Sequence, residues 1–174
     1  FKGGQEESLS REIVLVVLPF WDHLVRDILG IISDVDWPKP VKIKFHPTMN
    51  WKNYEEMIPK KFTVTSESIQ KLLSQALMVV GGNTGALVEA LALGIPVINV
   101  NKASSINYDY VPEIGKGIIW DQAEGVEEVR KLITQFQKTL DENPERLKEE
   151  GRQLRALCFA EPTHELIGQA LGLD

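Results

Sequence analysis

A glycine-rich run, Gly81-Gly82-Asn83-Thr84-Gly85, is the first candidate for chemistry because it separates an apolar strand pattern from an apolar helix pattern. Glycine lets a backbone approach a ligand closely, and the start of a helix offers unpaired N–H groups that suit phosphate. The Asn83 and Thr84 side chains add hydrogen-bonding groups to the same turn. The run is neither a P-loop nor a Gly-x-Gly-x-x-Gly dinucleotide loop. A tight turn with Thr84 as the helix N-cap stays open as the alternative.

A single carboxylate, Glu89, follows one turn into the expected helix, among the alanine, leucine and valine side chains of residues 86–92. A carboxylate in so apolar a helix costs free energy unless it is paired or reaches solvent or a ligand. Its two oxygens can accept hydrogen bonds from both hydroxyls of a ribose. An exposed position on the helix surface explains the residue equally well, so both interpretations stay open.

A lysine and a histidine mark the end of the second expected strand, where Lys44 precedes the pair His46-Pro47. Side chains two residues apart lie on the same face of a strand, so both could meet a phosphate or the edge of a base. A structural histidine at a strand end is the more common case and is the alternative. The His, Cys, Asp and Glu residues show no metal-ligand spacing, and no Gly-x-Ser-x-Gly elbow is present.

The elements that must position these residues alternate between strands and helices. Apolar runs predict strands at residues 13–18, 41–45, 62–65, 77–80, 96–100 and 118–120. Helical spacing predicts helices at residues 23–35, 69–76, 86–93, 125–140, 144–157 and 163–171, with a short helix within 50–60. Ser66 or Ser68 would cap the second of these. The alternation predicts a Rossmann-like α/β fold with three layers, whose mainly parallel six-stranded sheet has the order 3-2-1-4-5-6.

Length and composition exclude several classes of protein. The chain has 174 residues, 43% of them hydrophobic, with one cysteine and a net charge of −6. These values argue against a disulfide-stapled module and against a general nucleic-acid binder, and no apolar run approaches the length of a transmembrane segment. Residues 121–174 hold 12 acidic and seven basic side chains. The first 120 residues are therefore close to neutral, so an anionic ligand could bind there. We expect one globular, cytoplasmic domain.

Some aromatic and polar residues in the expected loops allow two interpretations. Trp21, Trp37 and Trp51 are expected at the edges of the core rather than in partner contacts. If another domain belongs beside this one, some of them should be exposed at the shared face. The run Asn107-Tyr108-Asp109-Tyr110 is expected to be a solvated loop rather than one that closes on a ligand.

Residues 84–100 resemble the donor-binding signature of GT-B glycosyltransferases: small residues at a helix start, then Glu-Ala-Leu-Ala, a glycine and Pro-Val-Ile. Residues 73–80 resemble the helix and strand that lead into that signature. The pair His46-Pro47 is similar to the His-Pro motif of bacterial capsule, sialic acid and polyol-phosphate transferases, many of which use CMP- or CDP-linked donors. The resemblance covers residues 41–120 well.

The resemblance implies a role for each matching residue. Glu89 would bind the ribose of the donor, while Ser66 and Ser68 at the end of the third strand would lie near its base. His46 would contact the nucleotide phosphate, and Lys44, although it does not match the family pattern, is our candidate for stabilising that phosphate as it departs. The donor would also be held by Pro47, Gly82, Asn83, Thr84, Gly85 and Ala86. No metal and no tightly bound cofactor are implied, because the nucleotide-sugar is a substrate.

Two features limit what the resemblance implies. Lys44 and Phe45 stand where similar proteins commonly carry arginine or proline before the His-Pro pair, which leaves a CMP-, CDP- or UDP-linked donor open. A GT-B enzyme also has two Rossmann-like domains, whereas this chain has the length of one. We therefore expect an arm at residues 1–12, a donor-nucleotide-binding domain at 13–142, and C-terminal helices at 143–174 that pack on it or toward an upstream acceptor-binding domain.

The function implied is that of the donor half of a glycosyltransferase in surface polysaccharide or lipopolysaccharide biosynthesis. The catalytic base would lie in the upstream domain, so this half alone would bind donor and be inactive. The resemblance also allows the full enzyme to associate peripherally with a membrane. The alternatives are a UDP-sugar 2-epimerase-type domain and a non-enzymatic α/β nucleotide-binding module.

Overall fold

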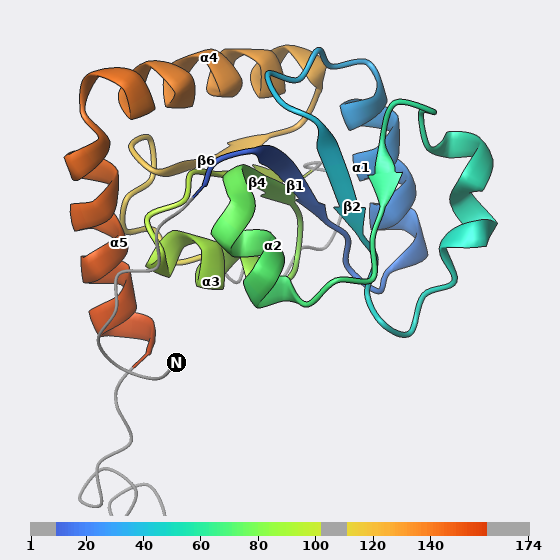
Figure 1. Cartoon of the computed structure of the whole chain (residues 1–174), viewed down its shortest axis with the longest axis horizontal. Helices are drawn as coiled ribbons and strands as arrows, with labels where there is room; N and C mark the ends of the chain where they lie inside the picture. The colour runs from blue at the N-terminus through green and yellow to red at the C-terminus, as the bar shows by residue number, and fades with distance from the viewer. Residues whose placement is uncertain (1–9, 102–110, 160–174) are drawn as a thin grey trace, which may run out of the picture.

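The computed structural model of the chain describes residues 10–101 and 111–159. Six strands form one sheet in the order β3-β2-β1-β4-β5-β6, and every pairing is parallel (Figure 1). The Rossmann-like α/β fold and the strand order predicted from sequence are thereby confirmed. The strands are β1 (Ile13–Val17), β2 (Val41–Lys44), β3 (Thr63–Val64), β4 (Ala76–Gly81), β5 (Val97–Val100) and β6 (Trp120–Ala123). The helices are α1 (Asp22–Ser33), η1 (Trp51–Met57, a 3-10 helix), α2 (Ile69–Gln75), α3 (Ala86–Ala92), α4 (Val126–Glu142) and α5 (Pro144–Cys158).

The two faces of the sheet carry separate apolar cores. Val14 and Val16 of β1 pack with α1 and α4 on one face, whereas Leu15 and Val17 pack with α2, α3 and α5 on the other. Figure 1 shows α4 along one side of the sheet, with α2 and α3 on the opposite side. Every residue of β1 is buried because both faces of this central strand are covered, which is why its sequence is continuously apolar.

The strand order reverses between β1 and β4, which are neighbours although two strands separate them in the chain. The connection from β1 leads to α1 on one face, and the connection from β4 leads to α3 on the other. The register pairs Val17 with Gly81, so the two strands end at the same level. Ligands of open parallel sheets bind at this kind of switch point, outside the carboxyl ends of the strands.

The C-terminal helix α5 packs directly on α3. A Cβ atom at Gly151 of α5 would lie 2.6 Å from the backbone nitrogen of Gly94 and 2.9 Å from the carbonyl oxygen of Leu91. Gly94 follows α3 with a φ of +73°, a conformation that glycine adopts without strain. Gly94 therefore ends α3 without strain, and the close approach of Gly151 brings the two helix backbones into contact.

The sixth strand was predicted in the wrong place. It runs over Trp120–Ala123 rather than residues 118–120. Gly115 and Gly117 both have a φ of +76°, and the turn that they form accepts a hydrogen bond at Gly115 O from the N–H of Ile119, 2.9 Å away. Ile119 is fully buried in the core beside α3, so its apolar character serves packing in a turn rather than a strand.

Three other predictions concern the ends of the chain and a loop. The expected helix at residues 163–171 and the run Asn107-Tyr108-Asp109-Tyr110 lie outside the described residues. Within the expected arm, the N–H of Ser10 donates to the carbonyl oxygen of Ser74 over 2.9 Å, so this part of the arm is held against the end of α2. The division into 1–12, 13–142 and 143–174 stays a prediction.

Candidate functional site

The loop between β4 and α3 presents free backbone donors at the switch point. Asn83 has a φ of +52°, in the left-handed region that asparagine tolerates better than most residues. In the described part of the chain, the N–H groups of Asn83, Thr84 and Gly85 make no hydrogen bond. The N–H of Ala86 is 3.5 Å from the Thr84 hydroxyl oxygen, at the limit of a hydrogen bond. Successive N–H groups in such a turn form a concavity that suits an anion.

Two side-chain oxygens near this loop are buried without a partner. They are Oδ1 of Asn83 and Oδ1 of Asn101, and they are the only such side-chain atoms among the described residues. Gly81 pairs with Asn99, so Asn83 and Asn101 each stand two residues beyond paired positions at the ends of adjacent strands. An unsatisfied buried polar atom costs about 1–3 kcal/mol. A bound ligand that offers hydroxyl or amide donors would remove this cost.

Two features of helix α3 bear on the site. It spans seven residues, so its dipole is short, and its N-cap is Gly85, with no hydrogen bond from a capping side chain. The alternative in which Thr84 is the N-cap is therefore wrong. Glu89 is half-buried, and its carboxylate makes no hydrogen bond or ion pair with any described residue. The backbone donors of the loop, rather than a long helix dipole, are the chemical feature of this site.

Lys44 and His46 have separate partners although they end the same strand. The Lys44 ammonium donates to the backbone carbonyl oxygen of Glu67 over 2.7 Å. The His46 Nδ1 atom is 2.7 Å from the Thr48 hydroxyl, and its ring centroid is 5.6 Å from that of Phe20. Pro47, next to His46, is exposed. An ammonium has three donors, so Lys44 retains two for another acceptor.

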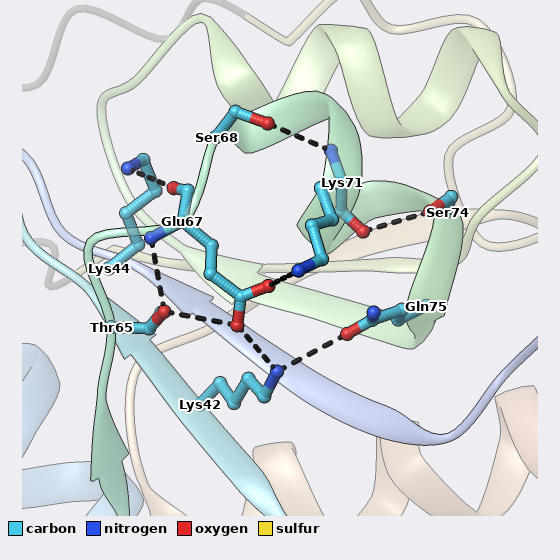
Figure 2. Close-up of polar contacts among 8 residues, drawn as sticks. All are labelled: Lys42, Lys44, Thr65, Glu67, Ser68, Lys71, Ser74 and Gln75. Atoms are coloured by element: carbon cyan, nitrogen blue, oxygen red, sulfur yellow. Dashed lines mark hydrogen bonds and ion pairs between the residues drawn. The ribbon is translucent and has the colours of Figure 1, made fainter.

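Glu67 is the centre of a charged network between β2, β3 and α2 (Figure 2). Its carboxylate is 2.7 Å from the Lys71 ammonium and 2.9 Å from the Lys42 ammonium. These hydrogen bonds lower the pKa of Glu67 from 4.5 to about 2, and the bond from Lys71 has the largest effect. The Ser68 hydroxyl accepts a hydrogen bond from the N–H of Lys71, which makes Ser68 rather than Ser66 the N-cap of α2. The network fixes the segment from β3 to α2.

Aromatic rings are exposed beyond β1, which the sequence led us to expect for Trp21 or Trp51 only at a face shared with another domain. Phe20 is 48% exposed and Trp21 is 42% exposed, with ring centroids 4.4 Å apart. Trp51 is 37% exposed, whereas Trp37 packs against the core and donates its indole N–H to the Ile32 carbonyl oxygen. The prediction that Trp21 and Trp51 are core edges is wrong, and that for Trp37 is confirmed. A sequence signal existed for Phe20, since a large apolar residue directly after Pro19 lies beyond the strand.

Solved structures with a similar fold include glycosyltransferases, a UDP-GlcNAc 2-epimerase and a wall teichoic acid polymerase. The glycosyltransferase SnogD from Streptomyces nogalater matches 94% of this chain with a TM-score of 0.59 and 19% identity. The UDP-GlcNAc 2-epimerase of Methanocaldococcus jannaschii, solved with UDP-GlcNAc and UDP, matches 89% with a TM-score of 0.54 and 16% identity. The wall teichoic acid polymerase TagF matches 94% with a TM-score of 0.51 and 9% identity. No protein-family model and no curated protein matches the sequence.

The matches define the fold class, a Rossmann-like domain of the kind found in GT-B glycosyltransferases. The chain spans 44%, 47% and 44% of the lengths of these three proteins, so each contains a further part that this chain does not match. Residues 10–101 and 111–159 contain no cluster of three or more His, Cys, Asp or Glu side chains that could hold a metal ion. No helix in the same ranges is long and apolar enough to cross a membrane.

Proposed function

We propose that this chain is the donor-binding domain of a nucleotide-sugar-dependent glycosyltransferase. The observation that carries the proposal is the β4–α3 loop, whose three unpaired N–H groups lie at the switch point of the sheet. A diphosphate has oxygen acceptors to match these donors, and it carries the negative charge that such a turn attracts. The fold shared with SnogD and TagF supports the same conclusion.

In this proposal the loop holds the phosphates, through Gly82, Asn83, Thr84, Gly85 and Ala86. Glu89 lies one turn further along α3, with a carboxylate that has no protein partner among the described residues. Such a carboxylate accepts both hydroxyls of a ribose. The buried Asn83 and Asn101 amides gain the partners that they lack, because a rotated amide can offer either its oxygen or its NH2 group.

Ser66 and Ser68 lie beyond β3 in the segment that the Glu67 network holds in place, and they line the position of the base. Lys44 and His46 act on the phosphate as it departs, the lysine with its two remaining donors and the histidine with the ring nitrogen that does not face Thr48. Fixed donors stabilise the developing charge without reorganising during the reaction. Pro47 holds the backbone next to His46 in place.

The rest of the enzyme belongs to an upstream acceptor-binding domain that supplies the catalytic base. We place the enzyme in the cytoplasm, attached peripherally to a membrane. Its donor is CMP-, CDP- or UDP-linked, and its product belongs to a surface polysaccharide or a lipopolysaccharide. The fold similarity to the polymerase TagF supports this choice of product class. Because the base belongs to the upstream domain in this proposal, we expect the donor half to bind nucleotide without turnover.

The test is calorimetry and thermal unfolding of the 174-residue chain with CMP, CDP, UDP and dTDP. A nucleotide at one hundred times its Kd should stabilise the fold by about 2.7 kcal/mol. The Glu89→Ala variant should lose this stabilisation, and Glu89→Gln should lose most of it, since an amide accepts fewer hydrogen bonds. The Glu55→Ala variant, which removes an exposed carboxylate on η1, is the matched control. Absence of binding to all four nucleotides would refute the proposal.

A UDP-sugar 2-epimerase-type domain is the second candidate, and the structural similarity to the M. jannaschii 2-epimerase favours it. Both candidates use the same phosphate loop and Glu89, so nucleotide binding does not separate them. Product analysis of the chain joined to its upstream domain does, because an epimerase yields an altered sugar without an acceptor and a transferase yields a glycoside. A non-enzymatic module would bind nucleotide and form neither product.

A further inference from the structure

Phe20, Trp21 and His46 form a group of neighbouring rings, which we name the aromatic cluster; Phe20 and Trp21 are exposed and His46 is half-buried. Phe20 is central, with its ring centroid 4.4 Å from that of Trp21 and 5.6 Å from that of His46. The rings come from two different connections, the one after β1 and the one after β2, which begin side by side because β1 and β2 are paired. Their proximity therefore depends on the pairing of β1 with β2 and not only on their positions in the sequence.

Trp21 is, like Trp51, an exposed tryptophan, and it differs in this from the other two tryptophans of the chain. Trp37 and Trp120 each donate the indole N–H to a backbone carbonyl oxygen, over 3.1 and 2.8 Å. The indole N–H of Trp21 has no partner among the described residues, and 42% of the residue is exposed. Exposing a large aromatic surface forgoes burial worth about 25 cal/mol per Å². An aromatic side chain with an unused donor is typical of a surface that binds something.

The aromatic cluster and the phosphate loop follow the two strands that meet at the switch point. Val17 and Gly81 are paired, so the connections that carry Phe20 and Asn83 leave adjacent strands at the same level. The first connection turns toward α1 and the second toward α3, on opposite faces of the sheet. A ligand held by the loop therefore has Glu89 and α3 on one side and the aromatic cluster on the other.

If the proposed function holds, this geometry determines where the ribose, the phosphates and the sugar of a nucleotide-sugar lie. The diphosphate separates the nucleoside from the sugar, so a ribose on Glu89 and phosphates on the loop direct the sugar away from α3. We propose that Phe20 and Trp21 of the aromatic cluster form the subsite for the sugar ring of the donor. A sugar ring has an apolar face of C–H groups and a rim of hydroxyls. The ring faces of Phe20 and Trp21 can pack on the apolar face of the sugar, and the Trp21 N–H can donate a hydrogen bond to one of its hydroxyls.

The experiment compares each nucleotide with its sugar-linked form, using UDP with UDP-N-acetylglucosamine, dTDP with dTDP-glucose, and CDP with CDP-glucose. Wild type should bind at least one sugar-linked form about tenfold more tightly than the free nucleotide. The double variant Phe20→Ala/Trp21→Ala should bind the free nucleotide as wild type does and lose this tenfold gain. The Trp51→Ala variant removes an exposed tryptophan on η1 and should keep it.

Fluorescence of the wild-type chain provides a readout that does not depend on a folded double variant. Acrylamide quenching should fall when the sugar-linked form is added and stay unchanged with the free nucleotide, and Trp21→Phe should remove the difference. Nucleotide binding with no sugar-dependent gain in any pair would overturn the aromatic subsite alone. Failure of every nucleotide to bind would overturn the proposed function, and the subsite with it. Protection of Trp21 by self-association, seen without ligand as protein concentration rises, would also overturn the subsite.

Discussion

Two polar regions of the molecule, the network around Glu67 and the β4–α3 loop, differ in whether their polar atoms already have partners. Around Glu67 the carboxylate, two lysine ammonium groups and a glutamine amide are joined by hydrogen bonds. In the β4–α3 loop three successive N–H groups and the Asn83 Oδ1 atom have no partner in the described chain. The polar groups around Glu67 are hydrogen-bonded to one another, whereas the donors and the acceptor of the loop remain available to a ligand.

The difference shows why charge alone is a poor guide to the site. Lys42, Lys44 and Lys71 are the most conspicuous cationic group in these two regions, yet each of their ammonium groups has an acceptor within the chain. The loop carries no charged side chain between Gly81 and Val88. Unpaired backbone donors at a switch point are therefore the stronger sign of a ligand, and the lysine network serves to position the neighbouring segment.

The largest expected effect comes from the backbone of the loop. A Cβ atom at Gly82 would overlap the carbonyl oxygen of Val100, which is backbone and cannot move aside cheaply. Gly82→Ala should therefore lower the free energy of unfolding by about 1–3 kcal/mol and abolish nucleotide binding. Urea unfolding and calorimetry measure the two effects. Gly85→Ala is the matched control, because a Cβ there has no atom within 4 Å. Equal stability of the two variants would contradict the close packing of β4 against β5.

The next effect concerns the unpaired donors themselves. Asn83→Asp keeps a residue that tolerates a φ of +52° but places a carboxylate beside the free N–H groups. The carboxylate should compete with phosphate, so the affinity for UDP should fall by about tenfold or more while the fold remains stable. Asn83→Gly, which keeps the backbone conformation and removes the amide, separates loss of the side chain from added charge. Unchanged affinity in the aspartate variant would place the phosphate elsewhere.

A smaller effect on stability is expected at the N-cap of α2, where the Ser68 hydroxyl already has a partner within the protein. The Ser68 hydroxyl accepts from the Lys71 N–H over 3.4 Å, a long bond for an N-cap. Ser68→Ala should cost about 0.5 kcal/mol of stability, at the low end for capping residues. Thermal unfolding measures it, with Ser66→Ala as the neighbouring control that should cost less. If Ser66→Ala proves the more costly of the two, the capping residue of α2 has been misassigned.

The smallest effect depends on pH. The pKa of Glu67 is about 2 in the folded chain, against its ordinary 4.5, because Lys71 and Lys42 hold the charged form. The stabilisation is therefore complete above pH 4.5 and is lost as the pH falls from 4.5 toward 2. The stability difference between wild type and Glu67→Gln in urea should be constant from pH 5 to 7 and shrink below pH 4.5. A difference that grows on acidification would contradict the network.

The sequence was sufficient for the architecture and for the position of the loop. Buried strands are continuously apolar and helices are amphipathic, so five strands and their order followed from pattern and handedness. It was insufficient for β6, because Ile118 and Ile119 are apolar for packing in a glycine turn whereas the strand itself reads Trp-Asp-Gln-Ala. Apolar character reports burial and does not by itself report backbone conformation.

The candidate site was only partly predictable for a related reason. The residues Asn83, Thr84 and Gly85 are conspicuous as a glycine-rich turn, but their lack of hydrogen-bond partners is a property of three-dimensional contacts. Asn101 and Phe20 lie 18 and 63 positions from Asn83 along the chain. Only the parallel register brings the ends of their strands level, and register depends on pairings across the whole sheet.

The contact between Gly151 and Gly94 has a mechanical consequence. Two helix backbones that touch without intervening side chains cannot slide past each other by rotamer changes, so α3 and α5 behave as one stiff body. The glycine loop is at the other end of α3, only seven residues away. A displacement of α5 would therefore be transmitted through α3 to the loop that contains Asn83.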